Sequence, residues 1–191
     1  MINHRFFFFL SLFIIISTSF LACSDSAQID ANDASKIIAK HLVADPEFKT
    51  IRFDYGEMKF NSDAEIAKLE SYKQLASEGL IKLEQISSKK KFLSKDSAFV
   101  YQVKLTDKAS DYVLKQGDGK AVVKAVIYEV DKDKEVTFNK VNDNHAKVTI
   151  HLKKINTPFA PFQKKQNEFS EFMTKTYRLK FDKNAGWKVT N

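Results

Sequence analysis

The sequence predicts an α+β fold in a single compact domain, in which helices come first and an antiparallel β-sheet follows. Apolar residues recur at intervals of three or four between Ile66 and Leu80, which is the period of a helix. From Phe99 onward, apolar and polar residues alternate, which is the period of a strand. In the C-terminal half, short runs of this kind are separated by turn-rich stretches such as QGDGK and NDNH, as in an antiparallel sheet.

A first helix is expected to begin at Asp33, whose side chain can cap it, and to run to about Ala44. It should end there because Asp45-Pro46 follows, and the residue before a proline is pushed away from helical geometry. Residues 47–60 show no clear period and are expected to be extended.

The second helix has clearer boundaries. Ser62 and Glu65 have the spacing of a capping box, in which the serine and the glutamate three residues later each bond the other's backbone amide. Gly79 lies where a helix commonly ends in a left-handed turn. A helix is therefore predicted between these residues.

The strands of the C-terminal half follow in order. Residues 105–114 are expected to form a short helix, and 121–130 an interior strand, because this run is apolar on both faces apart from Lys124 and Glu129. Further strands are predicted in EVTFNKV, AKVTIHLKKI, TYRLKF and GWKVT. In the second of these, four alternate residues should face the core: Ala146, Val148, Ile150 and Leu152.

A phenylalanine-rich segment, 156–177, interrupts these strands. Pro158 and Pro161 break the preceding strand, and a helix is expected after them. The segment predicts a candidate binding patch that caps a hydrophobic pocket or docks a partner, formed by Phe159, Phe162, Phe169, Phe172 and Met173. The alternative is that these side chains simply cover the sheet.

The N-terminus has the layout of a secretory signal. Arg5 supplies a positive charge, and an apolar stretch from Phe6 to Ile16, broken only by Ser11, is followed by small and polar residues. This stretch is shorter than the roughly 20 residues that span a bilayer comfortably. Residues 1–22 are therefore predicted to be a signal peptide.

The only cysteine of the chain, Cys23, follows this segment. The tetrapeptide Phe20-Leu21-Ala22-Cys23 resembles the lipobox of bacterial lipoproteins. The resemblance implies that the signal is cut between Ala22 and Cys23, that the thiol receives diacylglycerol and that the new amine is acylated. Two alternatives remain open: an uncleaved membrane helix, and ordinary secretion with a free thiol.

The lipobox resemblance also implies a location, and together with the sequence patterns it predicts a domain layout. In enteric bacteria an aspartate directly after the cysteine retains a lipoprotein at the inner membrane, but here the aspartate comes one place later, at Asp25. We therefore expect a periplasm-facing protein on the outer membrane, with the inner membrane as the alternative. Residues 23–32 would be the lipidated cysteine and tether, and 33–191 one periplasmic domain, with a helical part (33–115) and a sheet part (120–191).

Two further resemblances concern the folded part. The stretch from Leu69 to Leu114 resembles the second half of winged-helix domains of the MarR and PadR type, with Ala109 where a glycine is common. In such domains the basic loop, formed by Lys89, Lys90, Lys91 and Lys95, would be the wing. Here the loop either contacts an anionic surface or is a solvated hairpin tip.

The complete layout resembles a group of proteobacterial lipoproteins without an established activity. The shared features are Gly79-Leu80, Leu105-Thr106 and Gly186-Trp187, which follow a lipobox in that order. Because the group has no established activity, the resemblance implies no catalytic residue.

Residue types that support chemistry are sparse. After the signal, the histidines are His41, His145 and His151, and the last two would lie about 20 Å apart on a continuous strand. We therefore expect no metal site, no cofactor beyond the lipid on Cys23, and no catalytic residue. The net charge of +7 is compatible with an anionic partner or with solubility alone. Nucleic acid is not expected, because an exported, anchored protein seldom meets it.

These observations together predict a membrane-anchored envelope lipoprotein that acts non-catalytically, through contacts with an unidentified envelope protein. One alternative is a carrier or sensor that holds a hydrophobic ligand between the sheet and the Phe169–Met173 helix. Another is a lipoprotein that neutralises an incoming toxin.

Overall fold

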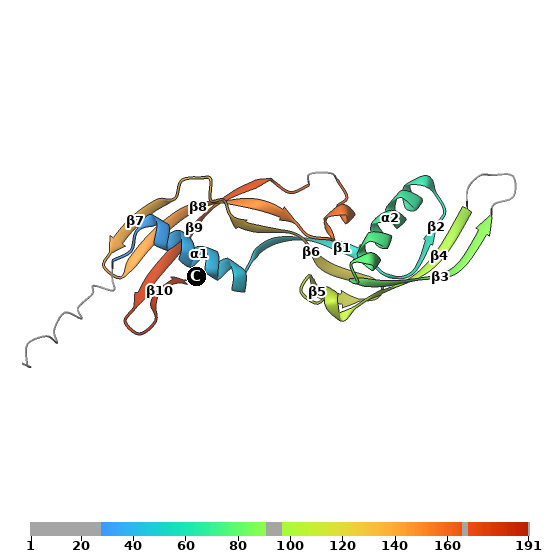
Figure 1. Cartoon of the computed structure of the whole chain (residues 1–191), viewed down its shortest axis with the longest axis horizontal. Coiled ribbons are helices and arrows are strands. Elements are labelled where there is room, and N and C mark those ends of the chain that lie inside the picture. The colour runs from blue at the N-terminus through green and yellow to red at the C-terminus, as the bar shows by residue number, and fades with distance from the viewer. Residues whose placement is uncertain (1–27, 91–96, 166–167, 191) are drawn as a thin grey trace, which may run out of the picture.

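The computed structural model describes residues 28–90, 97–165 and 168–190 (Figure 1). The described residues form mostly strands, so the expected order of helices first and sheet afterwards is wrong. The elements are α1 (Ala31–Ala44), β1 (Glu47–Asp54), β2 (Gly56–Phe60), α2 (Asp63–Ser77), β3 (Ile81–Lys90), β4 (Ser97–Leu105), the 3-10 turn η1 (Asp107–Ala109), β5 (Val113–Gly117), β6 (Lys120–Val130), β7 (Thr137–Asn142), β8 (His145–Asn156), the 3-10 turn η2 (Ala160–Phe162), β9 (Phe172–Asp182) and β10 (Gly186–Thr190).

A seven-stranded antiparallel sheet runs along the molecule in the order β1-β6-β8-β9-β10. Two shorter strands share edges with these: β5 pairs with the first half of β6, and β7 with the first half of β8. Figure 1 shows an elongated molecule, with α1 and β7–β10 at one end and α2 with β2–β4 at the other. Strands β1 and β6 connect the two ends.

Two separate cores lie along this sheet. The first core contains Phe53, Tyr72, Val103 and Phe159, and joins α2, the small β2-β4-β3 sheet and the first half of β6. The second core lies under α1. Its buried members include Ile38 and Leu42 of α1, Tyr128 of β6, and Ala146, Val148, Ile150 and Leu152 of β8. The predicted inward face of β8 is therefore confirmed.

Strand β6 contributes to both cores because it contains a β-bulge. Its register against β1 shifts by one residue, so that Ala125 has no opposite residue on β1. Before the bulge the core-facing residues are odd-numbered, Ala121 and Val123; after it they are even-numbered, Val126, Tyr128 and Val130. Because of this change of phase, the apolar core-facing residues of the run do not follow one strict alternation.

The helix boundaries follow local capping chemistry. Helix α2 begins with the predicted capping box: the Ser62 side chain accepts from the Glu65 amide, and the Glu65 carboxylate accepts from the Ser62 amide. Gly79 follows it with φ +75°. Helix α1 is capped by Asp30, which accepts from the Asp33 amide, so the expected cap at Asp33 is three residues too late.

The predicted helix within 156–177 is wrong. Residues from Phe172 onward form β9, which pairs with β8 from Lys153↔Phe172 to His145↔Lys180. The spacing of Phe169, Phe172 and Thr176 imitates a helix, but pairing with β8 satisfies the backbone of a whole strand edge and overrides the local pattern. Residues 105–114 also differ from the expected helix, since only η1 forms there before β5 begins.

Candidate functional site

Several predicted site residues lie outside the described residues. Ala22 and Cys23, at the expected cleavage and lipidation site, are among them, as are Lys91 and Lys95 of the basic loop. Lys89 and Lys90 end strand β3. Within the part of the chain that the structure describes, no helix is long and apolar enough to cross a bilayer.

The phenylalanine patch predicted from the sequence is divided between the two cores. Phe159 is completely buried in the first core, with its ring centroid 5.1 Å from that of Phe53. Phe162 is 8% exposed, and its ring lies 4.9 Å from Phe53 and 4.8 Å from Tyr72. Both side chains therefore hold the fold together rather than line a pocket.

The other three members of the patch belong to the opposite end of the molecule. Phe169 and Met173 pack against the second core, while Phe172 is 58% exposed and lies opposite Lys153 on β8. The five residues do not form one surface. The alternative interpretation, that they cover the sheet, describes four of them.

The three histidines of the folded part lie at separate places. His41 of α1 is 3.9 Å from the Asp45 carboxylate, His145 contacts the Asn142 side chain, and His151 contacts Thr174. Among the described residues, no three His, Cys, Asp or Glu side chains gather into a potential metal site.

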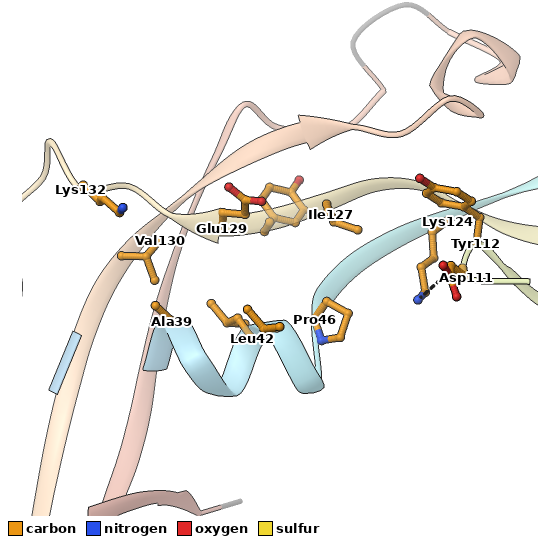
Figure 2. Close-up of a pocket in the computed structure, with 12 residues that line it drawn as sticks. Ala39, Leu42, Pro46, Asp111, Tyr112, Lys124, Ile127, Glu129, Val130 and Lys132 are labelled. Atoms are coloured by element: carbon orange, nitrogen blue, oxygen red, sulfur yellow. Dashed lines mark hydrogen bonds between the residues drawn. The ribbon is translucent and has the colours of Figure 1, made fainter. Parts of the chain in front are cut away.

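An apolar groove lies between the C-terminal half of α1 and strand β6 (Figure 2). We name it the α1–β6 groove; its volume is about 510 Å³. The α1 side contributes Ala39, Leu42, Val43 and Pro46; the β6 side contributes Lys124, Ile127, Tyr128, Glu129, Val130 and the following Lys132; and Asp111 and Tyr112 close the far end. Val43 is 85% exposed, the most exposed of the large apolar side chains in the described residues.

Lys124 places a cation inside this groove. Its Nζ donates a hydrogen bond of 2.9 Å to the carbonyl oxygen of Asp111 and lies 5.4 Å from the centroid of the Phe48 ring. Within the described residues, no carboxylate lies within 4.0 Å of this Nζ. Figure 2 shows the side chain pointing from β6 into the groove, toward Asp111.

Two further hollows are present, one beside the α1–β6 groove and one beside η2. One, of about 580 Å³, continues along the N-terminal half of α1 and shares Ala39, Val130 and Lys132 with the groove. The other, of about 440 Å³, is polar and lies beside η2, with Lys154 among its lining residues. The Lys154 ammonium forms an ion pair with Glu171, so its charge is already matched within the fold.

Two buried tyrosines serve the fold. The hydroxyl of Tyr72 donates to the carbonyl of Asp54 at 2.9 Å, and burial raises its pKa. Burial also raises the pKa of Tyr177, and the neighbouring Glu47 carboxylate, which Lys175 pairs, adds to the rise. Both hydroxyls therefore remain protonated donors at neutral pH, which suits a structural role.

Sequence reasoning missed the α1–β6 groove. The one available signal was Lys124, the only charged residue in the otherwise apolar run AVVKAVIY. Comparisons of the chain with protein-family models, with curated proteins and with solved structures found no match.

Proposed function

We propose that this chain is an envelope lipoprotein, anchored through acylated Cys23 to the outer membrane and facing the periplasm, which acts by binding other proteins. The observation that carries the anchor is the sequence itself: one cysteine, directly after a short apolar segment and the small residue Ala22. One acyl chain binds a membrane only marginally, whereas two or more anchor it stably.

The position of the first helix supports this proposal. Helix α1 begins at Ala31, capped by Asp30, so the folded part starts shortly after Cys23. The intervening residues are mainly small and polar and suit a tether. The domain would therefore work close to the membrane surface.

The shape of the molecule supports a role in binding. Large apolar side chains are exposed on four different elements: Val43 on α1, Ile86 on β3, Val141 on β7 and Phe172 on β9. Strand β3 belongs to the end formed by α2 and β2–β4, whereas α1, β7 and β9 belong to the other end (Figure 1). Such a surface offers contacts to more than one partner or to one long partner.

The anchor is tested by membrane fractionation of cells that express the full chain. We expect the wild type in the outer-membrane fraction. Cys23→Ser should be absent from that fraction, either as a soluble protein or as a chain that retains residues 1–22. Ser26→Ala, a conservative change in the tether, should behave as the wild type. Equal sedimentation of Cys23→Ser and wild type with outer membranes would refute the anchor.

The protein contacts are tested by photo-crosslinking in living cells. A photoreactive amino acid is introduced at Phe172, Ile86 or Val141, which are exposed, so the fold is retained. Discrete adducts that form with the anchored chain, but not when the chain also carries Cys23→Ser, would support partner binding in the envelope. Absence of protein adducts at all three positions in the anchored chain would contradict it.

A further inference from the structure

We propose that the α1–β6 groove binds a single-chain amphiphile with an anionic head group, the head on Lys124 and the chain along Leu42, Pro46 and Ile127. This would be a ligand-binding activity in addition to the proposed protein contacts. Neither the residues nor the location were expected from the sequence, which placed a ligand beside Phe169–Met173.

The dimensions of the groove suit such a ligand. Its volume of about 510 Å³ lies within the range of about 300–1,000 Å³ that small-molecule sites occupy. Its walls come from α1, from β6 and from the Asp111-Tyr112 segment, so a bound chain would lie between the helix and the strand (Figure 2).

The apolar surface continues beyond the groove. Phe48 on β1 lies directly opposite Ile127 on β6 and is 36% exposed. Val43 stands at the rim of α1 and is 85% exposed. Both side chains are thus apolar surface next to residues that line the groove: Phe48 beside Ile127 and Lys124, and Val43 in the lining itself.

The head group follows from the bonding of Lys124. An ammonium has three donors, and among the described residues the Asp111 carbonyl accepts from one of them; the Phe48 ring contributes a weak electrostatic contact. Neither neighbour carries a matching negative charge at Nζ. A ligand carboxylate or phosphate would add a charge-assisted hydrogen bond, which is roughly twice as strong as a neutral one.

The other charges of the groove favour this placement of the head. Glu129 lies opposite Lys153 on β8, so a cation already faces it. Lys132, at the other end of the lining, adds a second positive charge. Asp111 is exposed and presents its carbonyl, not its carboxylate, to Lys124. Lys124 is thus the cation that combines an apolar surrounding with unused donors.

The experiment uses the processed, anchored chain in phosphatidylcholine nanodiscs and a decanoate that carries a diazirine. After irradiation, mass spectrometry locates the label, and unlabelled decanoate, decyl phosphate, decanol and decylammonium compete. We expect label on residues 39–46 and 124–130. Both anions should compete at least about tenfold better than decanol or decylammonium, which is the effect of one charge-assisted bond. The ratio of the two anions distinguishes a fatty-acid carboxylate from a lipid phosphate as the natural head.

Matched variants assign the site. Lys124→Gln should weaken labelling about tenfold. Two controls should leave labelling unchanged: Lys124→Arg, which keeps the charge, and Lys115→Gln, which removes an exposed lysine of β5. Val43→Glu places a negative charge at the rim and should also reduce labelling. Val141→Glu, at an exposed valine on β7 away from the groove, serves as its control.

Several results would overturn the proposal. Label spread evenly over the surface, equal competition by decanol, or unchanged labelling of both Lys124→Gln and Val43→Glu would each do so. If the groove variants instead lost only crosslinks to envelope proteins, the groove would be a protein-docking site. The unprocessed Cys23→Ser chain should retain labelling in the same assay, so failure of the anchor and failure of the groove are distinguishable.

Discussion

At the scale of single residues, Phe53 lies at the centre of an aromatic cluster in the first core. Its ring lies within 5.4 Å, centroid to centroid, of the rings of Tyr72, Phe159 and Phe162. The four rings come from three distant parts of the chain: β1, α2 and the η2 segment. The aromatic cluster therefore fastens the phenylalanine-rich segment to the body of the fold.

This cluster gives the first prediction. Phe159→Ala should lower the free energy of unfolding by about 3–5 kcal/mol, because it removes a fully buried ring and leaves a cavity. Phe172→Ala should change it by about 0.5 kcal/mol or less, because that ring is largely exposed. Urea titrations followed by circular dichroism measure both. Equal effects would mean that the two rings share one environment.

Thr157 is the second residue with a structural task. Its amide donates to the Ala125 carbonyl at 3.0 Å, and its hydroxyl lies 2.7 Å from the Lys124 carbonyl oxygen and 2.9 Å from that of Ala125. Thr157 lies where the edge of β6 passes from β5 to β8, and it is 7% exposed. It thereby satisfies carbonyl groups at the β-bulge.

Thr157→Val should cost about 1–3 kcal/mol of unfolding free energy, because a buried carbonyl loses its donor. Thr157→Ser keeps the hydroxyl and should cost less than half as much. Chemical denaturation distinguishes the two variants. A valine variant as stable as the wild type would show that water or a neighbour replaces the hydroxyl.

Helix α2 illustrates capping at the scale of elements. Hydrogen bonds from the Asn61 amide, the Ser62 side chain and the Ser62 amide, in this order of importance, lower the pKa of Glu65. The unfolded chain therefore binds more protons than the folded one between the two pKa values, so stability falls as the pH drops through them. Above the unfolded pKa the contribution is complete.

We predict that the stability difference between the wild type and Glu65→Gln shrinks as the pH is lowered from 6 to 3. The glutamine can still accept a hydrogen bond but does not titrate, so only the wild type loses stability from this position. Thermal melts at several pH values provide the measurement. Glu70→Gln, on the exposed face of the same helix, is the control. A pH-independent difference would contradict the capping role of the charge.

The elements also show what the sequence could predict. Local signals were sufficient for α2, whose cap and terminating glycine flank the helix in the sequence, and for β8, whose residues alternate from Ala146 to Leu152. They failed for β9, because the phenylalanine spacing resembles that of a helix. This strand is stabilised by pairing with β8 from Lys153↔Phe172 to His145↔Lys180, which local sequence does not reveal. The α1–β6 groove was equally beyond reach, because its lining residues come from three separate parts of the sequence: 39–46, 111–112 and 124–132.

At the scale of the whole molecule, β6 joins the two cores. It can do so only because the bulge at Ala125 changes which residues face inward, from Ala121 and Val123 to Val126, Tyr128 and Val130. Without the bulge, one half of the strand would turn its apolar side chains to solvent.

Deletion of Ala125 should therefore cost more than about 4 kcal/mol, a large share of the total stability of a domain. The near-ultraviolet circular dichroism signal should be lost or its melting temperature greatly reduced. Deletion of Asp133, in the turn between β6 and β7, is the matched control and should be tolerated far better. Equal tolerance of both deletions would mean that the bulge is dispensable.

The proposed anchor at Cys23 would give the molecule its location, and the intact mass of the protein purified from membranes tests this proposal most directly. The account predicts a chain that starts at Cys23, is heavier than its residues by a diacylglycerol and one N-acyl group, and incorporates labelled palmitate. A mass that retains residues 1–22, or a Cys23 that carries no lipid, would contradict it.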